Sequence, residues 1–374
     1  MNITQEIGGL EQSMKKKKIN SEIEIQEETV TQDPGTSSHG VNVLSQKAKK
    51  SMVTRLISAA VALIICVPAL FLGDWFFFSF VTIALAVACW EILGCVHKRR
   101  WVIFIIYFTI VALIAYWPLF KGLIVNQGII TNNKPDSYFY SIYLSVLVVI
   151  ICIFVMFFFS VIYKDFTVHD AAFLIAMAVL IGMGFQCLFY LRYYPISAFQ
   201  IETTETFNFS FDNTIKSSLL VAFVCLSTFV TDAGAYFVGI FFGKRKMNER
   251  ISPKKTWEGF VGGVIISFAI TFTTGMMFAG FDYPILPSLD LTHWYFILIL
   301  SILIPLFATL GDFVFSSIKR YWGIKDYGKI MPGHGGVLDR LDSIFFASIV
   351  TAIFVFMITK AGADGKFEWE YFLV

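Results

Sequence analysis

The segment "SSIKRYWGIKDYGKIMPGHGGVLDRLDS", Ser316 to Ser343, separates two long apolar runs near the end of the chain. It gathers several basic residues, three aspartates, a histidine and a glycine-rich turn. Apolar runs of about 20 residues are long enough to cross a bilayer as helices. A polar segment between two such runs therefore predicts membrane helices joined by a polar loop at the membrane surface.

Composition extends this prediction to most of the chain. Hydrophobic residues fill 57% of the 374 positions and charged residues only 15%, and the mean hydropathy is +0.71. These values exclude an ordinary soluble domain and indicate an all-α polytopic membrane protein. We predict nine spans, at residues 53–73, 75–96, 101–124, 139–163, 168–190, 217–242, 258–281, 293–318 and 343–361. The junction "GDW" at 73–75 could instead be a kink inside one long helix.

The distribution of positive charge predicts the topology. With the N-terminus in the cytoplasm and nine alternating spans, 23 of the 29 Lys and Arg residues fall on the cytoplasmic side and six outside. Cytoplasmic loops of membrane proteins carry such an excess. We therefore expect a cytoplasmic N-terminus, an external C-terminus and the quoted segment on the cytoplasmic side.

Two regions differ in composition. Residues 1–50 are polar and contain no aromatic residue, so they lack the apolar surface that a folded core needs and are expected to be a disordered cytoplasmic extension. Residues 51–374 form the multi-span membrane domain.

A first polar segment on the predicted cytoplasmic side runs from Thr231 to Gly263. Asp232 lies inside a predicted span, where a carboxylate facing lipid would be unfavourable, so it is a functional candidate. The structural alternative is an aspartate satisfied by neighbouring hydroxyls such as that of Thr231. In "SPKKTWEG" we expect Ser252 to be a helix N-cap and Pro253 the first helical residue.

Lys254 and Lys255 would then occupy a first helical turn, where the helix dipole disfavours cations unless an anion binds there too. This predicts a phosphate site. The alternative is that both lysines only set the membrane topology.

The segment Ser316 to Ser343, together with Asp312 just before it, holds the second set of polar residues, which is the more informative of the two. If the preceding span is helical to its end, one face carries Asp312, Ser316, Lys319 and Arg320. In the glycine-rich turn, Gly333, Gly335 and Gly336 let the backbone approach a ligand closely. A helix then begins near Val337, and its free N–H groups predict an anion site.

Asp339 and Asp342 share a face of that following helix. Carboxylates without histidine or thiolate clusters suit Mg²⁺, which commonly joins one or two carboxylates to substrate phosphates. The combination predicts a site for a polyphosphate and its metal. The alternative is a charge-paired structural loop on the membrane surface.

Residues Ser316 to Asp342 resemble the signature of the phosphatidate cytidylyltransferase family, whose members are also called CDP-diacylglycerol synthases. "TDAGAY" from Thr231 and "SPKKTWEG" from Ser252 resemble further motifs of this family. The positions that carry the resemblance in the quoted segment are Ser316, Lys319, Arg320, Lys325, Asp326, Pro332, His334, Gly335, Gly336, Asp339, Arg340 and Asp342.

The resemblance implies transfer of the cytidylyl group of CTP to phosphatidic acid, which gives CDP-diacylglycerol and pyrophosphate. It implies Mg²⁺, with a second cation as a candidate, bound by Asp312, Asp339 and Asp342. The implied catalytic residues, which would touch the reacting phosphates or assist the metal, are Lys319, Arg320, Asp326, His334 and Arg340. The implied substrate-binding residues are Ser316, Lys325, Gly335, Gly336, Lys254, Lys255 and Asp232.

Two other functions remain open at this point. A CTP-dependent polyprenol kinase would share a nucleotide site and a multi-span body, and a transporter or channel could use Asp232 and Asp312 to line an ion path. The expected partners are CTP, phosphatidic acid and the lipid bilayer, with a homodimer as a candidate assembly and no nucleic acid. The expected location is the cell membrane in a bacterium, or an internal membrane in a eukaryote.

Overall fold

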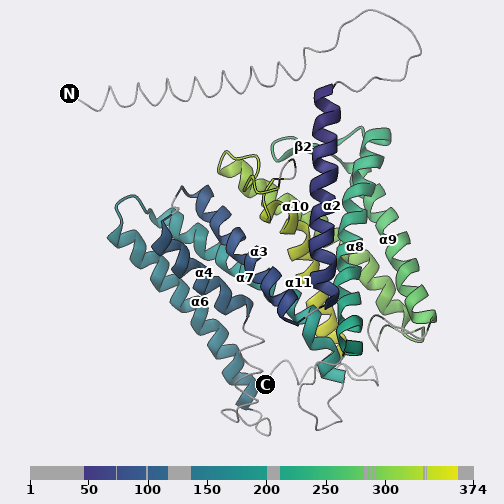
Figure 1. Cartoon of the computed structure of the whole chain (residues 1–374), viewed down its shortest axis with the longest axis horizontal. Coiled ribbons are helices and arrows are strands. Elements are labelled where there is room, and N and C mark those ends of the chain that lie inside the picture. Colours follow the sequence, from purple (N-terminus) through teal and green to yellow (C-terminus); the bar gives the residue numbers. More distant parts are fainter. Residues whose placement is uncertain are drawn as a thin grey trace, which may run out of the picture. The chain divides into compact units, whose positions relative to one another are not determined.

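The computed structural model describes residues 46–72, 74–97, 100–116, 136–199, 211–281, 285, 289, 291–331, 333 and 335–360 (Figure 1). The chain divides into two units, Met1–Lys50 and Ser51–Val374. Of the first unit only the start of helix α2, from Gln46, is described. The predicted disordered extension therefore lies largely outside the described residues and stays a prediction.

The described residues are mostly helical, which confirms the all-α class in its coarse form. One two-stranded hairpin is the only sheet among them. The elements are α2 (Gln46–Leu72), α3 (Asp74–Cys95), α4 (Trp101–Ala115), α6 (Asp136–Ile162), α7 (Val168–Phe199), α8 (Phe211–Phe242), β1 (Lys246–Asn248), β2 (Ser252–Thr256), α9 (Trp257–Gly280), α10 (Trp294–Tyr321) and α11 (Leu338–Lys360).

Within the described ranges, six helices are long and apolar enough to cross a membrane: Phe76–Cys95, Val168–Arg192, Ser218–Phe242, Trp257–Gly280, Trp294–Tyr321 and Leu338–Ile358. Three further apolar helices are shorter there: Ala60–Leu72, Trp101–Ala115 and Leu147–Ile162. Each of these helices corresponds to one predicted span. The count of nine spans and the sides of the two termini stay predictions.

The junction near residue 73 separates two helices. α2 ends at Leu72 and α3 begins at Asp74. The carbonyl of Leu70, in the last turn of α2, accepts hydrogen bonds from Arg192 Nε at 3.2 Å and from Ser218 Oγ at 2.9 Å. A carbonyl in the last turn lacks a partner within its own helix, so these donors from α7 and α8 stabilise the helix end here.

Helices α7 and α11 occupy the centre of the helical packing. α7 contacts α3, α4, α6, α8 and α11, and α11 also contacts α3, α8 and α10. In Figure 1, α4 and α6 lie on one side of this pair and α8 and α9 on the other. The rings of Phe185 from α7 and Phe345 from α11 meet edge to face at 5.0 Å. Helix α11 is thus packed among α3, α7, α8 and α10.

Small residues bring α8 and α9 close together. The buried residues of α9 recur at every fourth position: Gly259, Gly263, Ser267, Thr271, Gly275 and Ala279. A Cβ atom at Gly263 would lie 2.8 Å from the backbone carbonyl oxygen of Thr231 on α8. Four residues further along, the hydroxyl of Ser267 donates to the carbonyl of Ser227 at 3.0 Å. Such small-residue contacts are typical of membrane helix pairs, and they fix the segment of α8 that carries Asp232.

The predicted helix start at Ser252 and Pro253 is wrong. Residues Ser252–Thr256 form strand β2, which pairs antiparallel with β1, and α9 begins at Trp257. Thr256 is the N-cap, and its hydroxyl accepts the N–H of Gly259 at 3.2 Å. Glu258, an acid in the first turn, accepts the backbone N–H groups of Lys244 and Arg245.

This arrangement follows the helix dipole, because the first turn of α9 carries an acid rather than cations. The argument for a phosphate site from lysines in that first turn therefore fails. Lys254 and Lys255 lie on the strand instead.

Candidate active site

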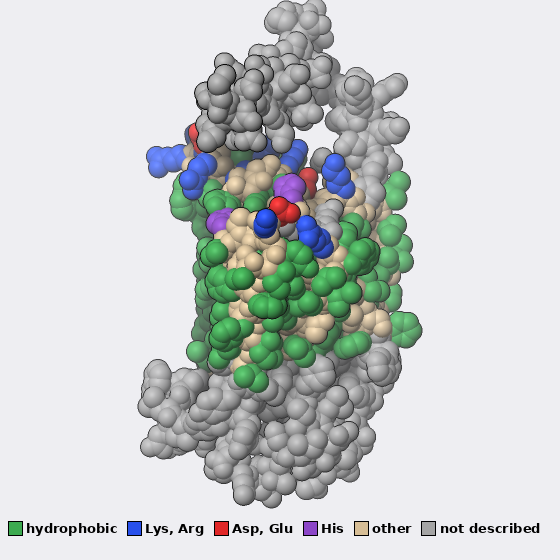
Figure 2. Space-filling view, turned by 90° about the vertical axis from the view of Figure 1, so that its left-hand side faces the viewer, with side chains coloured by type: hydrophobic (Ala, Val, Ile, Leu, Met, Phe, Trp, Pro, Cys, Tyr) green, Lys and Arg blue, Asp and Glu red, His purple; other side chains and the backbone are tan. Residues whose placement is uncertain are grey.

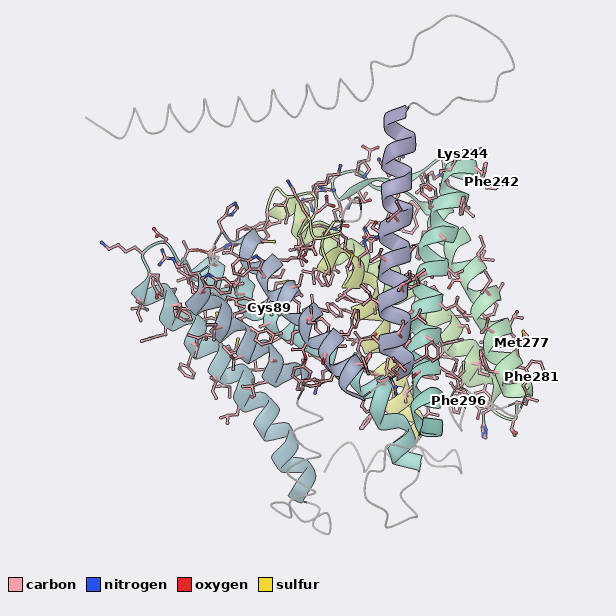
Figure 3. The ribbon with its side chains drawn as sticks, in the orientation of Figure 1. Cys89, Phe242, Lys244, Met277, Phe281 and Phe296 are labelled. Atoms are coloured by element: carbon pink, nitrogen blue, oxygen red, sulfur yellow. The ribbon has the colours of Figure 1, made fainter. Side chains whose placement is uncertain are left out.

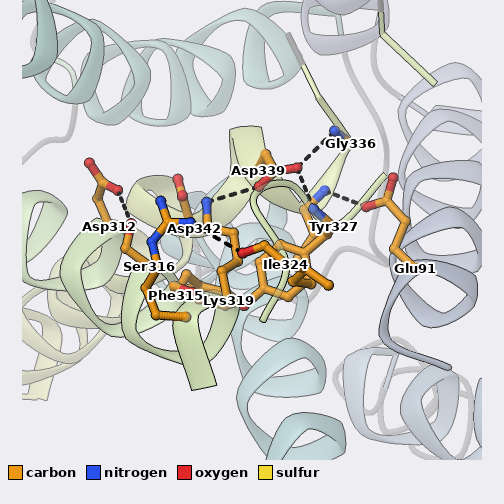
Figure 4. Close-up of polar contacts among 12 residues, drawn as sticks. Glu91, Asp312, Phe315, Ser316, Lys319, Ile324, Tyr327, Gly336, Asp339 and Asp342 are labelled. Carbon is orange, nitrogen blue, oxygen red and sulfur yellow. Dashed lines mark hydrogen bonds and ion pairs between the residues drawn. The ribbon is translucent and has the colours of Figure 1, made fainter. Parts of the chain in front are cut away.

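Polar side chains from five elements meet at one end of the bundle. They come from the C-terminal turns of α8 and α10, from β2, from the start of α11 and from the end of α3. Figure 4 shows the central contacts, which link Asp312, Lys319, Asp339 and Glu91 to their partners. Among the site residues predicted on α10, Asp312, Ser316 and Lys319 take part in this network, and the structure brings Asp339 and Asp342 of α11 beside them.

Asp312 links α10 to the hairpin. Its Oδ1 accepts the hydroxyl of Ser316 at 3.1 Å, one helical turn further along, and its Oδ2 contacts the ammonium of Lys255. The same ammonium lies 4.7 Å from the ring centre of Phe313. Lys255 is half-buried whereas Lys254 is exposed. The hairpin therefore delivers one positive charge to the carboxylate on α10.

Asp339 is held by three donors. Lys319 Nζ lies 2.9 Å from its Oδ1, and the backbone N–H groups of Tyr327 and Gly336 lie 2.9 and 2.8 Å from its Oδ2. Asp339 is 8% exposed and Lys319 is buried as well. The sequence predicts this carboxylate as a metal ligand, but here it joins α10, the loop and the start of α11.

A cluster of three carboxylates, those of Asp232, Asp312 and Asp342, lies next to the ion pair of Lys319 and Asp339. Asp342, 6% exposed, interacts electrostatically with Asp312, Lys319 and Asp232. Asp232 on α8 in turn interacts with Asp312, Lys255 and Arg340. Three helices thus bring negative charges together, and the lysines and Arg340 partly compensate them. Among the described residues, no group of three or more His, Cys, Asp or Glu side chains is arranged to hold a metal ion by itself.

The N-terminus of α11 does not offer the free N–H groups that the sequence predicts. The N–H groups of Val337 and Leu338 donate to the two carboxylate oxygens of Glu91 at 3.0 and 2.9 Å. That of Gly336 donates to Asp339. The expectation of an open anion site at this helix end is therefore wrong, because two of the protein's own carboxylates occupy it.

Residues 53–358 match the model of the cytidylyltransferase family. The chain belongs to this family. A phosphatidate cytidylyltransferase of Staphylococcus saprophyticus is 30% identical over 299 residues, which cover 79% of this chain and 95% of the relative. The corresponding protein of Staphylococcus haemolyticus is 29% identical over 296 residues, with the same coverage. That of Bacillus subtilis is 34% identical over 183 residues, which cover 49% of this chain and 57% of the relative.

In this member of the cytidylyltransferase family, several of the other predicted site residues are exposed at the edge of the site. Arg320 is exposed, and it donates from Nε to the carbonyl of Ile251 at 3.2 Å and from Nη1 to that of Ile324 at 3.3 Å. It thereby ties α10 to the turn of the hairpin. Lys325, Asp326 and Arg340 are exposed as well. His334 lies outside the described residues, so its predicted role stays a prediction.

Two further residues, Glu91 and Tyr327, belong to the site of this family member and are not among the predicted ones. Glu91 is an acid in an apolar run, "CWEILGC", and an intramembrane carboxylate is by itself a signal for a special role. Tyr327 carries no such signal. Its N–H holds Asp339, and its hydroxyl donates to the carbonyl of Phe315 at 3.1 Å. Burial, and then Cys95, Asp339 and Asp342 nearby, raise the pKa of the Tyr327 phenol, so it stays a neutral donor.

Proposed function

We propose that this chain transfers the cytidylyl group of CTP to phosphatidic acid and releases pyrophosphate. A phosphate oxygen of the lipid attacks the α-phosphorus of CTP, and the bond between the α-phosphorus and the bridging oxygen to the β-phosphorus breaks. The lipid phosphate is already ionised, so no proton has to be removed. The observation that carries the proposal is the set of lysines and aspartates at one end of the bundle, in a chain whose relatives bear the name phosphatidate cytidylyltransferase.

The proposed chemistry needs positive charge around several phosphate groups. When bound, Mg²⁺ neutralises phosphate charge and helps to align the two substrates. We propose Asp312 and Asp342 as its protein ligands, because Mg²⁺ commonly takes one or two carboxylates and completes its shell with phosphates and water. Asp339 is less suited, since three donors, Lys319 and two backbone N–H groups, already occupy it, against two donors at Asp312. A second cation stays a prediction.

The cations divide into buried and exposed groups. Lys255 and Lys319 each contact a carboxylate of the site and have little or partial exposure. We propose that they stabilise the charge that develops as pyrophosphate leaves, since preorganised cations in a water-poor site act most strongly there. Arg320, Lys325, Arg340 and Lys254 are exposed, and we propose that they bind the approaching CTP or lipid phosphate.

We infer that the site faces the cytoplasm. The ends of α3, α8 and α10 and the starts of α9 and α11 lie at the same end of the bundle, as alternating spans require. In Figure 2, Lys and Arg side chains gather above a band of hydrophobic ones. In Figure 3, Lys244 lies at this end, whereas Met277 and Phe281 lie at the opposite end of α9. With the positive-inside rule, this predicts nine spans with a cytoplasmic N-terminus and an external C-terminus.

The experiment uses purified protein in detergent with CTP, Mg²⁺ and phosphatidic acid. Pyrophosphate release that depends on phosphatidic acid is the expected result. A parallel reaction with a polyprenol in place of phosphatidic acid tests the kinase alternative. A kinase would transfer the γ-phosphate of CTP to the polyprenol and release CDP. No release above the control without lipid, from monodisperse protein, would contradict the proposal.

A further inference from the structure

Glu91 stands out because the proposed reaction does not use it, although it is among the most deeply buried charged residues. It is 1% exposed and lies near the end of α3. Its two oxygens accept the N–H groups of Val337 and Leu338, at the start of α11, from 246 and 247 positions away in the sequence. Figure 4 shows its carboxylate pointing at this helix end.

This contact is a strong one for physical reasons. The first N–H groups of a helix have no partner within the helix, and the positive end of the helix dipole favours a carboxylate there. Hydrogen bonds to an ionised acceptor are stronger than neutral ones, and a buried carboxylate without such partners would be very unfavourable. Glu91 therefore fixes where α11 begins relative to α3.

Two glycines make room for this carboxylate. A Cβ atom at Gly336 would lie 2.3 Å from Oε1 of Glu91, and one at Gly328 would lie 2.2 Å from the same atom. Both distances are far below van der Waals contact. Gly336 is not among the glycines with positive φ, unlike Gly335 at +85°. The space that Glu91 takes up, rather than the backbone conformation, therefore excludes a side chain at Gly336.

We propose that Glu91 is a positioning residue that fixes the first turn of α11 and the residues just before it. Gly328 and Gly336 leave the space that its carboxylate needs. The path to the site is short. Gly336, which borders Glu91, donates its N–H to Asp339, and Asp339 holds Lys319. The inference rests on the proposed function only for its activity measurement, and it assigns Gly336 a role different from contact with a substrate.

A double-mutant cycle tests this. We expect Gly336→Ala alone to lower turnover by about tenfold or more, because its methyl group displaces Glu91. Glu91→Ala alone should also lower turnover. In the Glu91→Ala background the methyl group meets no carboxylate, so Gly336→Ala should change turnover by less than about twofold. Gly280→Ala is the matched control, since a Cβ atom there meets nothing within 4 Å.

The same cycle also defines the result that would contradict the proposal. If Gly336→Ala lowers turnover by the same factor with and without Glu91, the glycine serves a substrate and the proposal is wrong. The KM for CTP gives a second criterion, because Glu91 touches neither substrate in the proposed scheme. Glu91→Gln should lower turnover and leave this KM unchanged, and a raised KM with normal turnover would contradict the positioning role.

Hydrogen exchange provides a measurement that is independent of activity. In Glu91→Gln, an amide donor replaces one acceptor oxygen, so the peptide that contains Val337 and Leu338 should exchange faster while peptides of α9 stay unchanged. Unchanged exchange at 336–338 would overturn the proposal, even for a variant that is inactive. If the wild-type protein shows no cytidylyl transfer, the proposed function fails, whereas the exchange experiment still tests the seating of α11.

Discussion

Lys319 and Asp339 form a buried ion pair, with Nζ and Oδ1 2.9 Å apart. Lys319 comes from the last turn of α10 and Asp339 from the first turn of α11. The pair therefore fixes the two helices on either side of the connection between Tyr321 and Leu338. Asp342, one turn further along α11, interacts electrostatically with Asp312 and Asp232 as well as with Lys319, and it accepts the backbone N–H of Ser343. The two aspartates on one helix face therefore have different tasks, and this difference leads to the first prediction.

Asp339→Asn and Asp342→Asn should separate structure from chemistry. Removing one partner of a buried ion pair leaves an uncompensated charge, so Asp339→Asn should lower the free energy of unfolding by about 3–5 kcal/mol. Asp342→Asn removes repulsion with Asp312 and should leave thermal stability unchanged or raised. Both should lower turnover by about a hundredfold or more. Thermal unfolding in detergent and pyrophosphate release check this; equal stability of the two variants would refute it.

Lys254 and Lys255 are adjacent on β2 but have different surroundings. Lys255 contacts Asp312, so Lys255→Ala should lower turnover by about a hundredfold. Lys254 is exposed, so Lys254→Ala should change turnover less than about threefold. This effect on turnover should become smaller as the salt concentration rises. Steady-state kinetics at several salt concentrations measure both effects. The resemblance implies a nucleotide contact for both lysines; similar effects of the two substitutions would support that simpler assignment.

The close contact of α8 and α9 predicts a steric effect. Gly263→Ala places a methyl group 2.8 Å from the carbonyl oxygen of Thr231. Such overpacking should lower the free energy of unfolding by about 1–3 kcal/mol. Gly280→Ala on the same helix meets open space and should be neutral or slightly stabilising. Thermal unfolding of the two variants in the same detergent compares them, and equal unfolding temperatures would argue against tight packing at this contact.

Removal of residues 1–45 tests the predicted extension. These residues show no pattern that could build a core, and Lys47, Lys49, Lys50 and Arg55 remain to set the topology. The specific activity of correctly inserted protein should stay within about twofold of that of the full chain. A larger loss would show that the extension takes part in the reaction or in lipid binding.

Some features of the site follow from the sequence because they depend on one helix. Asp312 and Ser316 are four positions apart in an apolar run, so their contact on one face of α10 is a direct consequence of helical periodicity. The pairing of Lys319 with a carboxylate is also foreseeable in kind, since a buried lysine needs one. Its choice of Asp339 over Asp342 depends on how the loop between them folds.

Other features depend on tertiary contacts that no local pattern contains. Glu91 reaches Val337 across 246 positions, and only the packing of α3 against α11 brings them together. The glycines of "GHGG" fit both contact with a phosphate, which the sequence predicts, and the space that Glu91 takes up beside Gly336, and no local pattern distinguishes the two. At α9, Ser252 and Thr256 are both good N-cap residues, and pairing of β2 with β1 decides between them.

The most direct test of the proposed function follows the phosphorus atoms of CTP. Purified protein is incubated with phosphatidic acid, Mg²⁺ and CTP that carries a radioactive label either at the α-phosphorus or at the γ-phosphorus. Cytidylyl transfer predicts that the α-label enters the lipid fraction and the γ-label leaves as pyrophosphate. Entry of the γ-label into lipid, with the α-label retained in CDP, would contradict the account and establish a kinase instead.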